Sequence, residues 1–344
     1  MVTTRRAKKR VGPSIADVAK LAGVSSQTVS RISTGAQQVS PKTREKVLAA
    51  MAELGYSPNR AARALRSGKF KVIGVLTQRI ERTGESLTAG GVVEAALEAG
   101  YTIALVQTHE PEKGDGRKLV RRLSEQAIDG LIIVQAGTST NEQLSLPSGL
   151  PVVVADSALT HLFPSVNADQ RAGMRQAMAH LIGLGHKYIA HVTGPRNSQS
   201  ALLRKEEWEK ALQEAQLPII PAFPGDWTAA SGYQAGKQIA ADKRITAVMC
   251  ANDEIAVGVM RALSEAGVNV PSEVSVIGFD GIELGEFLPT PLTTVRQDFA
   301  KTGRTMVDLV IQQINQGVIA GEFATLIPTQ LIVRESTALA GIRK

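Results

Sequence analysis

The stretch 14-SIADVAKLAGVSSQTVSRIS-33 decides the fold of the first part of the chain. Its apolar residues recur at helical spacing, which predicts two short helices joined by a tight turn. The apolar faces that we expect to meet are formed by Val18, Leu21, Ala22, Val29 and Ile32. Helices of this length with matching apolar faces form a helix-turn-helix.

The ends of both helices carry their own signals. Ser14, with Asp17 three residues later, resembles a capping box in which Asp replaces the usual Glu. Gly23 falls where the first helix must stop, at a position that favours a left-handed backbone. Ser25 can cap the second helix, and the small Ala19 allows the two helices to cross closely.

The second helix directs polar side chains outward, namely Ser26, Gln27, Thr28, Ser30 and Arg31. A Gln amide can pair with adenine and an Arg guanidinium with guanine in the major groove of DNA. The alternative is an ordinary helical hairpin with a solvated polar face. We favour DNA recognition because of the charge described next.

Charge is distributed unevenly along the 344 residues. Residues 1–70 hold 14 Lys/Arg and 3 Asp/Glu, a net charge of +11, whereas the rest hold 25 and 29, a net charge of −4. A small basic head on a mildly acidic body suggests a polyanion-binding module joined to a different domain. A disordered basic tail is the expectation for residues 1–12 only.

A third helix should complete the head. Ser40 and Pro41 supply a cap and a first helical residue, and Gly55 ends the helix. Its apolar stripe is expected to consist of Val47, Leu48, Met51 and Leu54. The following segment, AARALRSGK at 61–69, is too short to be a stable helix alone and should order only against DNA or a second copy.

The remaining sequence alternates β-branched runs with helical stretches. The runs fall at 72–76, 101–107, 130–134, 151–156, 188–194, 247–253 and 274–280. Continuous apolar strands separated by helices indicate parallel sheets covered on both faces. The pattern breaks near 166–169 and resumes with a helix over 171–184, which predicts two doubly wound lobes with a cleft at facing strand ends.

Several function classes are excluded or disfavoured. No apolar run approaches the ~18–20 residues of a membrane span, and no apolar segment follows the basic N-terminus as in a secretory signal. The single cysteine, Cys250, excludes an internal disulfide, fits a reducing cytoplasm and is expected to be a buried, inert thiol. A transport-type sugar-binding protein is disfavoured by the missing signal and by the basic head.

An enzyme on a doubly wound fold is also disfavoured. The chain has no G-x-G-x-x-G, P-loop, G-x-S-x-G or H-E-x-x-H motif, so we expect no catalytic residue, cofactor or metal. The histidines lack ligand spacing and should occupy surface or helix-end positions; they are His109, His161, His180, His186 and His191.

Polar residues follow the predicted strands where a ligand would bind. They are Asp156, Asn252, Asp253 and Asp280, together with Arg204 on a helix and Trp227 in a loop. Carboxylates, amides and guanidinium groups can hold vicinal hydroxyls, and an indole can cover the C–H face of a sugar. Taken singly, each Asp could instead cap the next helix, and the Trp could belong to the core.

Three segments of the head resemble the lactose repressor (LacI) family of bacterial transcription regulators. They are IADVAKLAGVSSQTVSR (15–31), VSPKTREKVLAAMAELGYSPN (39–59) and RAARALRSGK (60–69). The resemblance continues through GDWTAASGYQ (225–234) and LTTVRQDF (292–299) to about residue 340. It implies a cytoplasmic, DNA-binding repressor that responds to a small sugar or glycoside.

The resemblance also implies the architecture: an N-terminal all-α helix-turn-helix head and an α/β body with two lobes of parallel, doubly wound sheets, like a periplasmic sugar-binding protein. The expected parts are the helix-turn-helix domain at 13–58, a hinge helix at 59–70 and an effector-binding and dimerisation body at 71–340. Crossings between lobes are placed near 168, 297 and 327, giving a first lobe of about 71–168 and 298–326 and a second lobe of about 169–297 and 327–340.

Site residues are carried over by position. The resemblance assigns DNA binding to Ser14, Ser25, Ser26, Gln27, Thr28, Ser30, Arg31, Asn59, Ala62 and Leu65, with Leu65 as a minor-groove wedge. It assigns effector hydroxyls to Asp156, Ser200, Arg204, Asn252 and Asp280, stacking to Trp227, and the hinge side of the cleft to Gln297 and Phe299. The expected partners are a near-palindromic operator, the effector and a second copy of the chain.

The sequence departs from the family pattern in three places. The segment QRIERTGES at 78–86 is charged where the related sequence is largely apolar, so the ligand is more polar or larger, or the charges are merely solvated. Ser26 replaces a tyrosine in the recognition helix, which predicts an altered operator half-site. The chain ends without leucine heptads, so a dimer rather than a tetramer is expected.

Overall fold

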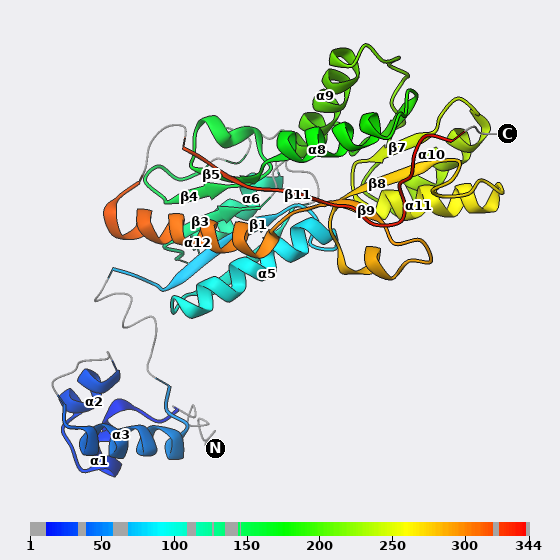
Figure 1. The fold of residues 1–344 in the computed structure, drawn as a ribbon. Coiled ribbons are helices and arrows are strands. Elements are labelled where there is room, and N and C mark those ends of the chain that lie inside the picture. The colour runs from blue at the N-terminus through cyan, green and yellow to red at the C-terminus, as the bar shows by residue number, and fades with distance from the viewer. Residues whose placement is uncertain are drawn as a thin grey trace, which may run out of the picture. The chain divides into compact units, whose positions relative to one another are not determined.

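The structure is a computed structural model that describes residues 12–33, 39–57, 68–108, 115–125, 127–134, 144, 146–318 and 323–341 (Figure 1). The chain divides into two compact units, Met1–Phe70 and Lys71–Lys344. Each unit is described by itself. The predicted hinge residues Asn59, Ala62 and Leu65 and the predicted tail up to residue 11 lie outside the described residues.

The first unit contains α1 (Ile15–Ala22), α2 (Ser26–Ser33) and α3 (Pro41–Leu54). The predicted capping box is confirmed, because Ser14 Oγ accepts a hydrogen bond from the Asp17 amide and the Asp17 carboxylate accepts one from the Ser14 amide. Ser25 Oγ likewise accepts from the Thr28 amide at 3.1 Å. Gly23 ends α1 with a φ of +66°, a left-handed conformation that costs glycine little.

The core of the first unit is built from small side chains. Its buried members are Val18, Ala19, Val29, Ile32, Val47, Ala50 and Met51. The predicted apolar faces were wrong at two positions, since Leu21 is 46% exposed and Leu48 is 52% exposed. Ala19 is buried as expected for a close crossing, and Ala50 is buried where Leu48 was predicted, because helices that cross closely leave room only for small side chains between them.

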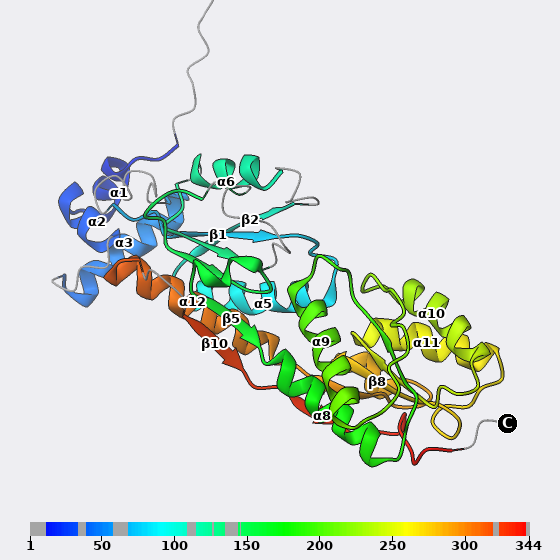
Figure 2. The same ribbon diagram turned by 90° about the horizontal axis from the view of Figure 1, so that it is seen from above.

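The first lobe of the body has a six-stranded sheet in the order β10-β5-β4-β3-β1-β2, with every pair parallel. The strands are β1 (Val72–Thr77), β2 (Thr102–Gln107), β3 (Gly130–Ile133), β4 (Val152–Val154), β5 (Ser165–Ala168) and β10 (Ala324–Ile327). Helices α5 (Thr83–Glu98) and α12 (Phe299–Gln316) pack together on one face, and α6 (Asp115–Glu125) covers the other (Figure 2).

The second lobe has a five-stranded sheet in the order β11-β9-β8-β7-β6, parallel except for β11 at its edge. The strands are β6 (Ile189–Val192), β7 (Ala247–Cys250), β8 (Ser275–Asp280), β9 (Thr293–Arg296) and β11 (Gln330–Ile332). Helices α8 (Gln170–Gly183) and α9 (Gln199–Glu214) cover one face, and α10 (Ala229–Ala241) and α11 (Asp253–Glu265) cover the other. The predicted fold class, with two parallel α/β lobes, is confirmed.

The chain passes from one sheet to the other at three places, which lie after β5, after β9 and between β10 and β11 (Figure 1). The seven predicted strands are present. The predicted break near 166–169 coincides with the end of β5, where the chain passes to the second sheet, but β5 itself was not predicted. Strands β9, β10 and β11 were not predicted. No helix of the described residues combines the length and the apolar character needed to cross a membrane.

Two histidines are buried, and His191, in β6, contradicts the expectation of surface or helix-end positions, whereas His186 follows the end of α8. His186 is 2% exposed and His191 is fully buried. His191 Nδ1 donates to the Met249 carbonyl at 2.7 Å, and its ring lies 5.4 Å from the Trp208 ring. Burial lowers the pKa of His191 to about 4, so the ring is a neutral member of the core.

Candidate functional site

The outer face of α2 is the candidate nucleic-acid surface of the first unit. Val29 and Ile32 of this helix are buried in the core of the unit. Ser26, Gln27 and Arg31 are exposed, while Thr28 and Ser30 are half-buried. Ser14 and Ser25 are exposed at the N-termini of α1 and α2, where backbone N–H groups favour an anion such as phosphate.

The body contains a cavity of about 740 Å³ lined by residues of both lobes. All the residues predicted to bind an effector line it: Asp156, Ser200, Arg204, Trp227, Asn252, Asp280, Gln297 and Phe299. They belong to segments that are far apart in the sequence. The ends of parallel strands bring them together, as expected for a doubly wound sheet.

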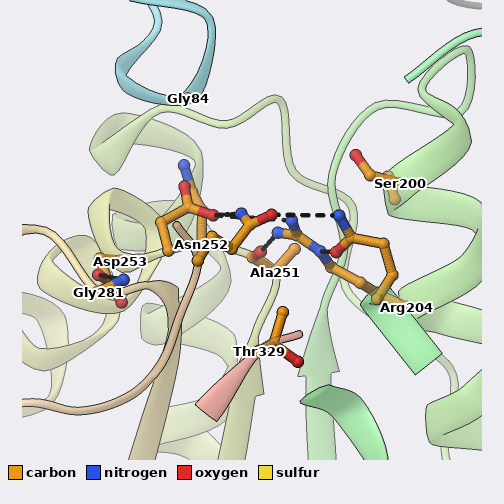
Figure 3. A network of polar contacts seen from close by, with 12 residues as sticks. Gly84, Ser200, Arg204, Ala251, Asn252, Asp253, Gly281 and Thr329 are labelled. Carbon is orange, nitrogen blue, oxygen red and sulfur yellow. Dashed lines mark hydrogen bonds and ion pairs between the residues drawn. The ribbon is translucent and has the colours of Figure 1, made fainter. Parts of the chain in front are cut away.

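Arg204 projects from α9 and is only 3% exposed. Its Nη1 donates to the Ala251 carbonyl (Figure 3). Its Nε donates to Gln170 Oε1 at 2.8 Å, and its Nη2 lies 3.6 Å from Asp280 Oδ1. The guanidinium carbon lies 3.7 Å from the centre of the Phe279 ring. Burial lowers the pKa of Arg204, and neighbouring carboxylates oppose this. The hydrogen bonds, the ion pair and the ring contact together hold the guanidinium in one orientation.

Asp280, the last residue of β8, accepts a hydrogen bond from Gln297 Nε2 at 2.6 Å. Gln297 Oε1 in turn accepts one from Gln170 Nε2 at 3.2 Å. Burial raises the pKa of Asp280 to about 8, although Arg204 acts in the opposite direction. These four side chains form a closed polar network beside the passages between the lobes.

Asp156 follows β4 of the first lobe and reaches the N-terminus of α9 in the second. Its Oδ1 accepts from the Ser200 amide at 2.6 Å and its Oδ2 from the Ser198 hydroxyl at 3.2 Å. Burial raises the pKa of Asp156, and these hydrogen bonds oppose it. The N-terminus of a helix is a favourable place for a carboxylate, so this contact helps to hold the lobes together.

Trp227 and Asn252 form another side of the cavity. The Trp227 ring lies against Gly194, where an added Cβ would be 2.5 Å from a ring atom, so only glycine fits there. Asn252 Oδ1 caps α11 by accepting from the Ile255 amide at 3.0 Å. Its Nδ2 donates to the Trp227 carbonyl at 3.1 Å and to Glu254 Oε2 at 2.8 Å. Capping and cavity lining therefore coexist at Asn252.

Among the cavity residues that were not predicted to bind an effector, Gln170, Thr83 and Glu254 make hydrogen bonds across the cavity. Gln170 begins α8 and bonds both Arg204 and Gln297. Glu254 accepts a hydrogen bond from the Thr83 hydroxyl, which joins α11 of the second lobe to α5 of the first. A correct assignment of β5 would have identified Gln170 as a residue next to a strand end, because β5 ends two residues before it.

Asp253, in contrast, is not among the lining residues of the cavity. It accepts hydrogen bonds from the Thr294 hydroxyl at 2.6 Å and from the amides of Gly281 and Ile282 at 2.8 Å. Burial raises the pKa of Asp253 to about 7. The carboxyl group anchors the loop after β8. Within the described residues, no group of three or more His, Cys, Asp or Glu side chains could hold a metal ion.

Sequence profiles define the class of protein. The profile of the bacterial regulatory proteins of the lacI family matches residues 14–59, and that of a periplasmic binding protein-like domain matches residues 178–337. The chain belongs to the lacI family. It is therefore a cytoplasmic, DNA-binding transcriptional repressor with an effector-binding body, and it is not an enzyme.

Individual relatives cover almost the whole chain. The lactose operon repressor of Escherichia coli K12 is 36% identical over 93% of this chain and 89% of its own length. The repressor PurR of Haemophilus influenzae strain PittEE is 34% identical over 94% and 98%. A crystal structure of the lac repressor dimer bound to operator and the anti-inducer ONPF matches with a TM-score of 0.85, 35% identity and coverage of 95% and 100%.

Proposed function

We propose that the chain represses transcription as a homodimer on a near-palindromic operator, and that a neutral sugar or glycoside bound between the lobes changes its operator affinity. Asp156, Ser200, Arg204, Asn252 and Asp280 hold the hydroxyl groups of the effector. Trp227 covers its apolar face, and Gln297 and Phe299 line the hinge side. The same cavity can serve an inducer or a corepressor.

The mixed charge of the cavity is the observation that carries the sugar assignment. Its lining includes six carboxylates and three guanidinium groups, from Glu81, Glu85, Asp156, Asp226, Glu254, Asp280, Arg79, Arg82 and Arg204. A hydroxyl group both donates and accepts hydrogen bonds, so a polyhydroxylated ligand can use both kinds of group. The excess of carboxylates disfavours an anionic ligand.

Related structures support a glycoside. The lac repressor has been solved with ONPG in its repressed state, at 35% identity to this chain and a TM-score of 0.85. The transcriptional regulator CelR has been solved as a complex with cellobiose, at 29% identity, a TM-score of 0.71 and coverage of 94% of this chain and 99% of that one.

Operator recognition depends on the exposed face of α2. In a dimer, two copies of this helix would enter successive major grooves, with Gln27 and Arg31 at base edges. Selection of duplexes from a random library by the purified chain should yield a near-palindromic site. Arg31→Ala should reduce discrimination against a mismatched base by about 1–3 kcal/mol, the contribution of one good bidentate contact.

Lys46→Ala provides the matched control for Arg31→Ala, because it removes the same charge from an exposed position of α3. It should weaken binding to all duplexes alike and leave the order of preference unchanged. If Arg31→Ala also weakens binding to all duplexes alike and leaves the order of preference unchanged, Arg31 contacts phosphate only. If the wild-type chain prefers no duplex over random sequence, the proposed repressor function is wrong.

The effector is found by screening the purified chain against monosaccharides, disaccharides and nucleobases by thermal shift. A ligand that binds the folded state alone raises the unfolding temperature by mass action. Each ligand that does so is then added to the chain on its selected operator, and the change in operator affinity is measured by fluorescence anisotropy. A response to nucleobases and to no saccharide would refute the sugar assignment and leave DNA binding intact.

A further inference from the structure

One wall of the cavity comes from a single tight turn of the first lobe. Strand β1 ends at Thr77 and α5 begins at Thr83. Residues 78–85, which we call the first-lobe wall, contribute Gln78, Arg79, Glu81, Arg82, Thr83, Gly84 and Glu85 to the lining. The sequence left open whether the charges of this segment contact a ligand or are only solvated. Their burial distinguishes the two interpretations.

Glu85 is not a solvated charge, since it is only 5% exposed. Its Oε2 accepts hydrogen bonds from the Thr77 hydroxyl and from the amides of Gln78 at 2.9 Å and Arg79 at 2.7 Å. Its Oε1 is buried without a hydrogen-bond partner in the described part of the chain. One carboxylate oxygen therefore shapes the turn, and the other is buried beside Arg82.

Arg82 lies beside this oxygen, with 21% of its side chain exposed. Its Nη1 is 3.6 Å from Glu85 Oε1, and its guanidinium makes no hydrogen bond to any residue that the structure describes. Burial lowers the pKa of Arg82, and the nearby carboxylates oppose this. A guanidinium has five N–H donors, so Arg82 presents donors to the cavity while its ion pair with Glu85 fixes its position.

The second lobe differs from this wall. There Arg204 and Asp280 are joined to Gln170 and Gln297 in a closed network that is complete before any ligand arrives. The cavity volume of about 740 Å³ lies in the upper part of the ~300–1,000 Å³ range of small-molecule sites. A ligand that contacts both lobes would therefore find oriented groups in the second lobe and the donors of Arg82 in the first.

We propose, building on the sugar-responsive function above, that the first-lobe wall is a subsite for a second hydroxylated unit, so that the effector is a disaccharide or a longer glycoside. Arg82 donates to oxygens of this unit, and the buried Glu85 carboxylate holds the turn and the guanidinium beside it in place. An apolar substituent at this place would cover the Arg82 guanidinium without giving its donors partners, which costs binding free energy. The wall therefore selects against glycosides with an apolar aglycone.

The proposal is tested by titration calorimetry of the full-length chain with lactose, cellobiose, maltose, melibiose, sucrose and trehalose. The disaccharide that binds most tightly is then compared with two glycosides of one of its own sugar units, the methyl glycoside and the phenyl glycoside. We expect the disaccharide to bind at least about tenfold more tightly than either, because only it pairs the polar groups of the wall. A phenyl glycoside that binds as tightly as the disaccharide would overturn the proposal.

Arg82→Met keeps the aliphatic stem of the side chain and removes its donors. It should weaken disaccharide binding about tenfold and change methyl glycoside binding by less than about twofold. Arg82→Gln, which retains donors without the charge, should fall between wild type and Arg82→Met, and it replaces Arg82→Met if that variant does not fold. Equal weakening of both ligands by either variant would overturn the proposal.

Arg121→Met is the matched control, because Arg121 also pairs with a glutamate in the first lobe but is 76% exposed on α6 and does not line the cavity. It should leave all affinities unchanged. Different outcomes would contradict the subsite and the proposed sugar-responsive function. If a monosaccharide binds and no disaccharide binds more tightly, only the subsite is wrong; if no saccharide binds at all, the sugar function fails as well.

Discussion

The polar residues on α2 of the head and the charged residues around Arg204 in the body differ in their exposure. Ser26, Gln27 and Arg31 lie open to solvent on a helix whose other face packs into a small core. Arg204 and Asp280 are buried, and each is hydrogen-bonded to a glutamine side chain, Arg204 to Gln170 and Asp280 to Gln297. A surface that reads DNA must be open to its partner, whereas a cavity that recognises a small ligand benefits from groups oriented in advance.

This difference predicts which substitutions should destabilise each unit most. The head has few buried side chains, and its exposed reading face adds nothing to its core, so its stability depends on single apolar residues. The body has larger cores on both faces of each sheet, but it also contains buried charges. Removing one partner from such a charged group leaves the others unpaired, and this is costly.

The largest effect is expected for Arg204→Ala. It should lower the free energy of unfolding of the body by about 3–5 kcal/mol, the range found when one partner of a buried ion pair is removed. Urea unfolding followed by tryptophan fluorescence measures the body alone, because both tryptophans, Trp208 and Trp227, belong to it.

The control is Arg261→Ala, which removes an arginine that is 71% exposed and paired with Glu265 on α11. An exposed pair of this kind contributes at most about 1 kcal/mol. If both variants lose the same amount, the network around Arg204 does not stabilise the body more than a surface pair does. The comparison between open and buried groups would then fail.

The next effect is expected in the head. Ile32→Ala removes a core side chain that is 5% exposed and should cost about 2–5 kcal/mol. In so small a unit this loss should abolish operator binding, measured by fluorescence anisotropy, while unfolding of the body followed by tryptophan fluorescence stays unchanged. A parallel loss in the body would show that the two units do not unfold independently.

Leu48→Ala is the matched control, since Leu48 is 52% exposed on α3. A surface substitution of this type should change stability by no more than about 0.5 kcal/mol. The sequence alone would have predicted similar losses for both residues, because helical periodicity indicates an apolar stripe but not which of its margins faces a neighbour. In the structure, Ala50 rather than Leu48 is buried.

The sheets show the same limit of sequence reasoning. The predicted strands are runs of β-branched residues, and most of them are buried on both faces, where the pattern is unambiguous. The strands that were missed, SVNA in β5, TTVR in β9, ATLI in β10 and QLI in β11, contain polar residues and so form no continuous apolar run. Two of them, β10 and β11, lie at sheet edges, where a continuous apolar run is not required.

The cavity was predictable where a polar residue directly follows a recognisable strand, as Asp156, Asn252 and Asp280 do. It was not predictable where a residue acts through a partner distant in the sequence. Gln170 bonds Gln297 across 127 residues, and Thr83 bonds Glu254 across 171. Only the fold brings such pairs together, so no local pattern identifies them.

The smallest effect concerns the pH dependence of the body. Burial raises the pKa of Asp280 to about 8, above its ordinary value of 3.8, so the folded body holds a proton that the unfolded chain releases. Stability should therefore decrease as the pH rises through this window. His191, whose pKa burial lowers to about 4, has the opposite effect up to its ordinary value of 6.5. Asp253, whose pKa burial raises to about 7, acts in the same direction as Asp280, so the part due to Asp280 is measured between pH 6.5 and 8 as the difference between the wild type and a variant.

Asp280→Asn should reduce this dependence, because an amide has no proton to lose. Between pH 6.5 and 8 the wild-type body should lose about 1–2 kcal/mol more than the variant, since one proton corresponds to at most about 1.4 kcal/mol per pH unit. Urea unfolding at several pH values measures both slopes, and Asp308→Asn, which alters an exposed carboxylate of α12, should keep the wild-type slope. Equal slopes for wild type and Asp280→Asn would mean that Asp280 is already ionised in this range, held by Arg204, so that the cavity carries one more negative charge near neutral pH.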